Sequence, residues 1–120
     1  MSTQSENAIL WIEKLLTAEK DGIKQGKKIL GSQEEGFCCL GYGCFVTNTE
    51  YKPHMPLSDY FQGVVGLKDE CGKPSDGQYS CVVMNDGKSF TFPQIAEQLR
   101  DNASSYFTPS VSRSIKEHFA

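Results

Sequence analysis

The sequence predicts a single small α+β domain over residues 1–120, with three to four helices packed on a small antiparallel sheet. Two segments, residues 8–16 and 92–99, repeat apolar side chains at helical spacing. The apolar, β-branched run at residues 79–84 precedes an Asn-Asp-Gly turn at residues 85–87, a pattern typical of a β-hairpin. A chain of 120 residues without a linker or an internal repeat suits one hydrophobic core.

The first helix is expected to begin at a capping box. Thr3 and Glu6 have the spacing at which each side chain accepts a hydrogen bond from the backbone N–H of the other residue. The apolar stripe that follows consists of Ala8, Trp11, Ile12, Leu15 and Leu16. Asp21-Gly22 is expected to end the helix, because glycine readily adopts the left-handed conformation found at helix ends.

The decapeptide at residues 37–46 is expected to form the centre of the core. It carries no charge and holds three of the five cysteines. A helix is favoured there over a buried strand, because several of its apolar positions share one helical face, although periodicity in so short a run leaves the strand open. A short extended piece at residues 28–30 and a turn at residues 33–36 precede the decapeptide.

Residues 47–80 are expected to be rich in loops, because prolines and glycines are dense there. One or two helical turns are expected at residues 57–61, with Ser58 or Asp59 as the cap. Residues 68–78 are expected to form an exposed loop, and a loop of this length is either mobile or functional.

Two further helices are predicted near the carboxyl end. Thr91 is the expected N-cap of the first, with Pro93 in its first turn and Gln94 at the capping-box position. Its expected buried stripe is Phe92, Ile95, Ala96 and Leu99. The last helix is expected to open at Thr108-Pro109 and to place three apolar side chains on one side, Val111, Ile115 and Phe119.

Charge and composition narrow the function classes. The net charge is −3 and the pI is near 5.3, whereas a general nucleic-acid binder usually carries a basic face. A local lysine cluster is interleaved with Glu19 and Asp21 and is therefore interpreted as a solvated edge (Lys20, Lys24, Lys27 and Lys28). With no signal peptide or membrane span in the pattern and an odd number of cysteines, we expect a reducing cytoplasm and free thiols.

Two sequence blocks resemble a family of small tailed-phage and prophage proteins. The first is Phe37-Cys38-Cys39-Leu40-Gly41 with Cys44, preceded by Gln25-Gly26, and the second is Met84-Asn85-Asp86-Gly87-Lys88-Ser89-Phe90 running into Ile95-Ala96. The resemblance covers residues 9–103. The chain departs from the pattern by two extra residues between Phe90 and Ile95, and by a tail over residues 104–120. The resemblance implies a viral accessory protein and lends this chain no activity.

The cysteines allow three interpretations. Cys39, Cys44, Cys71 and Cys81 could form a zinc site, but neither pair has the short spacing of a zinc knuckle. Cys38 or Cys39 could be a nucleophile with His54 or His118 as its base, Gln25 as an oxyanion donor and Asn85 or Asp86 orienting the histidine. Buried thiols that act as small hydrophobic side chains are the favoured interpretation, so no metal and no cofactor are predicted.

The polar residues of the two blocks are the candidate binding site. Asn85, Asp86 and Ser89 form either a tight turn whose side chains bond to nearby backbone, or a polar loop that lines a pocket with Gln25 and Tyr42. The turn is the favoured interpretation. The five residues are nevertheless the candidates for contact with a ligand or a partner.

The predicted function is that of a non-enzymatic, phage-encoded accessory protein in the host cytoplasm. It would bind and inhibit or sequester a host component, either a protein such as a defence protein or a small signalling molecule. General nucleic-acid and membrane binding are not expected, and self-association into a homo-oligomer is left open. The alternatives are a small thiol-dependent hydrolase and a structural or regulatory phage protein.

Overall fold

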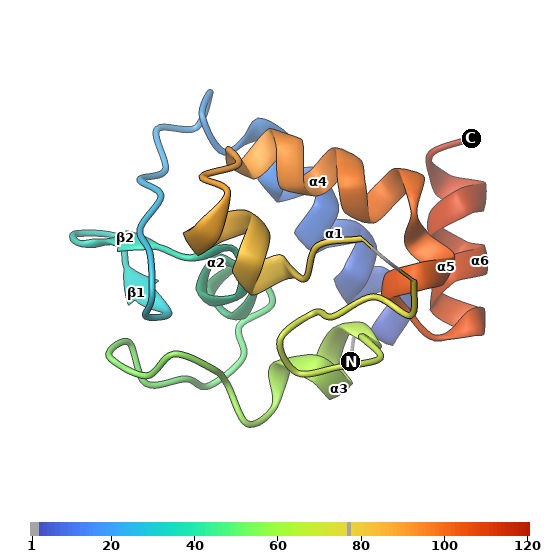
Figure 1. Ribbon diagram of the computed structural model, residues 1–120, viewed down its shortest axis with the longest axis horizontal. Helices are drawn as coiled ribbons and strands as arrows, with labels where there is room; N and C mark the ends of the chain where they lie inside the picture. The colour runs from blue at the N-terminus through green and yellow to red at the C-terminus, as the bar shows by residue number, and fades with distance from the viewer. Residues whose placement is uncertain (1–2, 77) are drawn as a thin grey trace.

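Helix α1, Gln4–Thr17, runs through the middle of the computed structural model, which describes residues 3–76 and 78–120 (Figure 1). It contacts α2, Cys39–Val46; α3, Phe61–Val65; α4, Phe92–Asp101; and α6, Pro109–His118. Its predicted capping box is present. The helix ends at Thr17, before the predicted stop at Asp21-Gly22, and turns connect it to Gly22, which has positive φ. The buried stripe is confirmed for Ala8, Trp11, Ile12 and Leu15, whereas Leu16 is only partly buried.

Trp11 connects α1 to the cysteine-rich decapeptide. Its indole N–H donates to the carbonyl of Cys39 at 3.0 Å, and its ring meets Phe61 edge to face with centroids 4.9 Å apart. A buried indole needs such a hydrogen-bond partner, because the polar N–H is otherwise desolvated without compensation. The tryptophan therefore fixes where α2 and α3 sit against α1.

The helix favoured for the decapeptide is confirmed for its last eight residues, α2, whereas Phe37 is part of a strand and Cys38 is the N-cap; most of the decapeptide lies in the core. Its two glycines allow an unusually close approach: a Cβ at Gly41 would lie 1.8 Å from the carbonyl oxygen of Leu30, and one at Gly43 would lie 2.2 Å from the ring of Phe61. The helix penalty of about 1 kcal/mol for each glycine is therefore offset by close packing. The Sγ of Cys38 caps the helix by accepting from the backbone N–H of Gly41 at 3.3 Å.

The sheet is smaller than predicted. It consists of β1, Gly31–Ser32, and β2, Gly36–Phe37, which pair antiparallel with Gly31 opposite Phe37. The predicted extended piece at residues 28–30 is wrong, because Lys28 has a φ of +72° and turns the chain before the strand begins. The turn between the strands is confirmed. The α+β class is thus confirmed only coarsely: the described part of the chain is mostly helical, with a two-stranded sheet.

The predicted strand and hairpin at residues 79–91 are wrong, because the chain becomes helical at Cys81. Ser80 caps this turn: its Oγ accepts from the N–H of Val83 at 3.1 Å and its carbonyl accepts from the N–H of Met84 at 2.9 Å. The turn continues as the π-helical η1, Val83–Gly87, closed by a bond from the N–H of Lys88 to the carbonyl of Val83. Helical spacing buries the side chains that a strand would have placed on opposite faces, Cys81 and Met84.

The segment after α2 differs in part from expectation. The helical turns predicted at residues 57–61 are displaced, since α3 begins at Phe61, where the Oγ of Ser58 accepts the N–H of that residue at 3.2 Å. The loop predicted at residues 68–78 is tied to a segment near the carboxyl end of the chain: the N–H of Ser75 donates to the carbonyl of Ser105 at 2.9 Å. Residue 77 of that loop lies outside the described residues.

The carboxyl-terminal helices confirm the capping analysis. Helix α4 begins with the predicted box of Thr91 and Gln94 and buries the predicted stripe (Phe92, Ile95, Ala96 and Leu99). A short helix that was not predicted, α5, Ala103–Tyr106, joins it to α6. The side chain of Thr108 makes no capping bond to α6, although Pro109 opens that helix as expected. None of the helices in the described ranges is both long and apolar enough to cross a membrane.

Candidate functional site

Four of the five candidate residues meet where residues 25–28 lie against η1 and the start of α2. Asn85 is at the centre and only 1 % exposed. Its Oδ1 accepts from Gln25 Nε2 at 2.9 Å and from the backbone N–H of Cys39 at 3.2 Å. Its Nδ2 donates to the carbonyl of Gly26 and to Asp86 Oδ1, both at 2.8 Å. We call this network the Asn85 clamp.

The clamp uses the full hydrogen-bonding capacity of its central side chain. An asparagine amide has two donor hydrogens and accepts at two lone pairs, and all four positions of Asn85 are occupied. A ligand could bond to this side chain only by displacing one of these partners. Asn85 therefore positions the chain segments around it.

The outer part of the clamp is less buried. Asp86 Oδ1 also accepts the backbone N–H of Lys28 at 3.0 Å, and the ammonium of Lys27 donates to the hydroxyl of Ser89. Lys28 and Ser89 both have positive φ, at +72° and +54°. Left-handed backbone costs an ordinary residue about 1–2 kcal/mol, so the clamp compensates for local strain.

Tyr42, the fifth candidate, lies apart from the clamp. It is buried in an aromatic cluster: its ring stacks on Phe92 with centroids 5.4 Å apart, and Phe37 lies 5.6 Å away. Burial, together with the negative charge of Asp21, raises the pKa of the Tyr42 hydroxyl. Its ring therefore contributes to the core of the fold.

The thiols of the decapeptide are protonated at neutral pH. Burial raises the pKa of Cys38 to about 12 and that of Cys44 to about 11. Hydrogen bonding to Cys81, followed by burial, raises the pKa of Cys39, whose Sγ donates to the carbonyl of Cys81 at 3.5 Å. A nucleophilic cysteine requires the opposite shift, because the thiolate is the reactive form.

The residues proposed to assist such a cysteine are also separated. His118 Nε2 lies 3.4 Å from Glu13 Oε2 at the surface, His54 lies in an exposed loop, and Gln25 belongs to the Asn85 clamp. No histidine donates to or accepts from a thiol in the described ranges. In the same residues, no three His, Cys, Asp or Glu side chains gather as they would around a metal ion.

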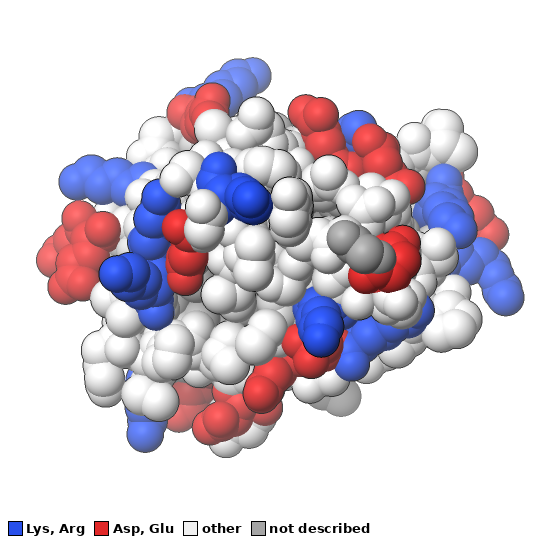
Figure 2. All heavy atoms as spheres, viewed as in Figure 1, with Lys and Arg blue, Asp and Glu red and all other residues white. Residues whose placement is uncertain are grey.

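A surface hollow beside η1 was not predicted from the sequence. It has a volume of about 410 Å³ and is lined by residues of the loop and of η1, namely Asp69, Cys71, Lys73, Gln78, Tyr79, Ser80 and Val83. Figure 2 shows an uncharged area in the middle of this face, with Lys, Arg, Asp and Glu side chains around it. We call the lining surface the η1 hollow.

Tyr79 is the aromatic residue that lines the η1 hollow. Its side chain is 45 % exposed, yet its ring meets Phe90 edge to face at 6.4 Å and carries the ammonium of Lys88 at 4.9 Å. Its carbonyl accepts the hydroxyl of Tyr106. Val83, 41 % exposed, lies on the outer side of η1. The sequence gives no local signal for this pair, because the helical segment begins at Cys81, between the two residues.

No protein-family model, curated protein or solved structure matches the chain.

Proposed function

We propose that this chain is a non-enzymatic accessory protein that binds a host protein through the η1 hollow and thereby inhibits or sequesters it. The observation that carries the proposal is a half-exposed aromatic side chain, Tyr79, which packs against Phe90 beside a hollow that combines the apolar Val83 with the charged Asp69 and Lys73. Tyrosines of this kind dominate the binding energy of many protein interfaces, because they bury a large area at a low cost in conformational entropy. A phage origin and action in the host cytoplasm rest on the resemblance of the two sequence blocks.

A molecule of this size has enough accessible surface for a standard protein–protein interface. A standard interface buries about 800 Å² on each protein, roughly an eighth of the 6511 Å² of accessible surface in this molecule. The contact would therefore extend from the η1 hollow across η1 itself. The four occupied bonds of Asn85 support this location over the polar loop, since the clamp has little capacity left for a partner.

The buried thiols support a binding function over the alternative of a thiol-dependent hydrolase. Such a hydrolase needs a thiolate beside a base, and the raised pKa values of Cys38 and Cys44 oppose this. Hydrolysis of an ester or peptide substrate that is abolished by iodoacetamide would reverse this ranking.

The proposal is tested by native mass spectrometry of the tagged protein purified from a bacterial host. We expect a stoichiometric complex that is lost in Tyr79→Ala and in Val83→Asp. The matched control is Tyr60→Ala, which removes a tyrosine that is 60 % exposed in the loop before α3. A complex that survives both η1-hollow substitutions would refute the proposed surface. A protein that forms only homo-oligomers would support the structural or regulatory alternative.

A further inference from the structure

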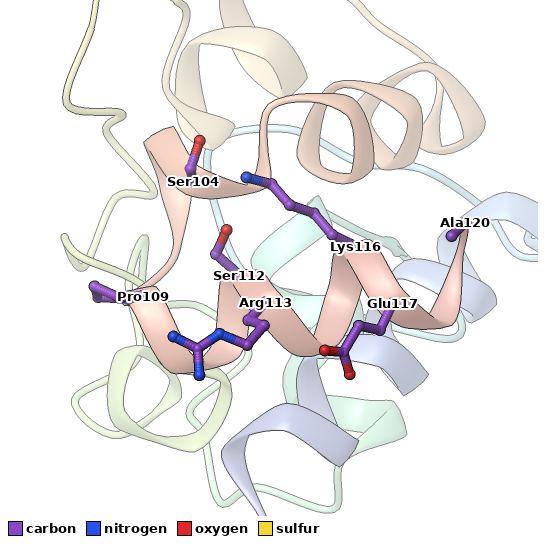
Figure 3. A pocket seen from close by; sticks show the side chains of 7 residues that line it. All are labelled: Ser104, Pro109, Ser112, Arg113, Lys116, Glu117 and Ala120. Carbon is purple, nitrogen blue, oxygen red and sulfur yellow. The ribbon is translucent and has the colours of Figure 1, made fainter.

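A second hollow lies between α5 and α6, away from the η1 hollow and the Asn85 clamp. Its volume is about 510 Å³, within the range of about 300–1,000 Å³ typical of small-molecule sites. Both helices contribute polar side chains to it, Ser104 from α5 and Ser112, Arg113 and Lys116 from α6. Figure 3 shows Lys116 extending from α6 toward α5, with the hydroxyl of Ser112 on the same side.

Ser112 is the informative residue of this hollow. It is only 3 % exposed, and its hydroxyl faces the hollow, where water can reach it; among the described residues, Thr108 Oγ1 is the one buried side-chain oxygen or nitrogen without a partner. In Figure 3 this hydroxyl points into the hollow, where a ligand oxygen can replace the water bonded to it.

The charges of the hollow favour an anion. Lys116 extends toward α5 beside the hydroxyls of Ser112 and Ser104, and no salt bridge among the described residues involves it. The other two charged side chains of the lining, Arg113 and Glu117, lie together on the opposite side of α6 in Figure 3. The net charge of −3 repels anions at long range. An anion is therefore attracted to this hollow only by the positive charge close to it.

We propose that this hollow binds a small phosphate monoester. Lys116 is the counter-ion, because an ammonium group binds phosphate as a compact point charge. The hydroxyls of Ser112 and Ser104 donate to the phosphoryl oxygens, and the organic part of the ligand rests on the ring of Pro109. The site is independent of the proposed protein interface, which lies on a different part of the surface.

The test is a titration of the ¹⁵N-labelled protein with phenyl phosphate, followed by NMR. We expect amide shifts confined to α5 and α6, with a Kd of about 1 mM or tighter. Removing the charge with Lys116→Gln should weaken binding about tenfold, and Ser112→Ala should weaken it several-fold, since both remove bonds to a charged group. The matched control, Lys20→Gln, removes an exposed lysine outside the hollow and should leave the affinity unchanged.

Three outcomes would overturn this proposal. The first is a spectrum that stays unchanged up to about 10 mM phenyl phosphate, a concentration well above the expected Kd. The second is equal affinity in Lys116→Gln and the unsubstituted protein, with both shown to be folded by thermal unfolding. The third is equal binding of benzoate, because a carboxylate would then satisfy the site as well as a phosphate does. Loss of the protein partner in the preceding experiment would not affect any of these results.

Discussion

The Asn85 clamp makes a sharp prediction about stability. Asn85→Ala removes four hydrogen bonds at once and leaves the backbone N–H of Cys39 without a partner in a fully buried place. An unsatisfied buried donor costs about 1–3 kcal/mol, and the three more accessible bonds each contribute roughly 0.5–1 kcal/mol because water can replace the lost partner. Together these terms lower the free energy of unfolding by about 2.5–6 kcal/mol.

That loss is large for a protein of this size. Domains are commonly stable by about 5–15 kcal/mol, so this loss is a substantial fraction of the total. The corresponding fall in Tm is roughly 10–25 °C for a chain of this length. Urea denaturation followed by tryptophan fluorescence measures the effect directly, because Trp11 donates to the carbonyl of Cys39 beside the clamp.

Asn85→Asp tests the donor half of the clamp separately. A carboxylate keeps the two bonds from Gln25 and Cys39, but it places an oxygen against the carbonyl of Gly26 and against Asp86. Burial and this repulsion raise the pKa of the new carboxyl in the folded state. The variant is therefore less stable than the unsubstituted protein, and this difference in the free energy of unfolding is greatest at neutral pH. It shrinks as the pH falls toward about 4, where the carboxyl is protonated in the folded state and begins to be protonated in the unfolded state as well.

The matched control is Asn7→Ala, which removes a single side-chain bond of 3.2 Å to the carbonyl of Val64. Its cost should be within about 1 kcal/mol of zero, because alanine is also the better helix former. Equal unfolding free energies for Asn85→Ala and Asn7→Ala would refute the clamp. A pH-independent deficit in Asn85→Asp would refute the assignment of donors and acceptors.

Three further measurements test the fold. Urea denaturation should show that Gly41→Ala lowers the free energy of unfolding by about 3 kcal/mol or more, because its Cβ would collide with the Leu30 carbonyl. The control Gly63→Ala should be neutral or stabilising, because its Cβ would meet no atom within 4 Å. Thr91→Ala removes the N-cap of α4 and should lower Tm through a loss of about 1 kcal/mol. In thiol labelling at pH 8, Cys71 should react first, since it is partly exposed and the other four cysteines are buried. Fast labelling of Cys38 in the native protein would contradict the burial of the Cys38 thiol.

Local sequence signals determined two helices almost completely. The capping boxes of α1 and α4 involve residues three positions apart, and their apolar stripes repeat within a single helix. Such signals act over one or two turns, so the sequence contains all the information that they need. The helical preference of the decapeptide was also readable from its sequence, although its two glycines became explicable only from the Leu30 backbone and the Phe61 ring beside them.

Segments without a strong local signal were decided by tertiary contacts. The apolar run at residues 79–84 suits a strand by propensity, but burying Cys81 and Met84 against the same core requires a helical turn. The extended piece expected before β1 fails because Lys28 turns to donate its backbone N–H to Asp86, a residue far away in the sequence. In both segments, contacts with residues distant in the sequence outweigh the local preference for an extended backbone.

For the candidate site, the sequence by itself singled out Gln25 and Asn85 through the two sequence blocks, and the tertiary structure decided that they join in one network. Only the packed chain shows that Asn85 uses every hydrogen bond internally, while Tyr79 and Ser112 line hollows at the surface. The reason is physical: hydrogen-bond saturation and exposure depend on neighbours distant in the chain, and no local pattern of residues records them.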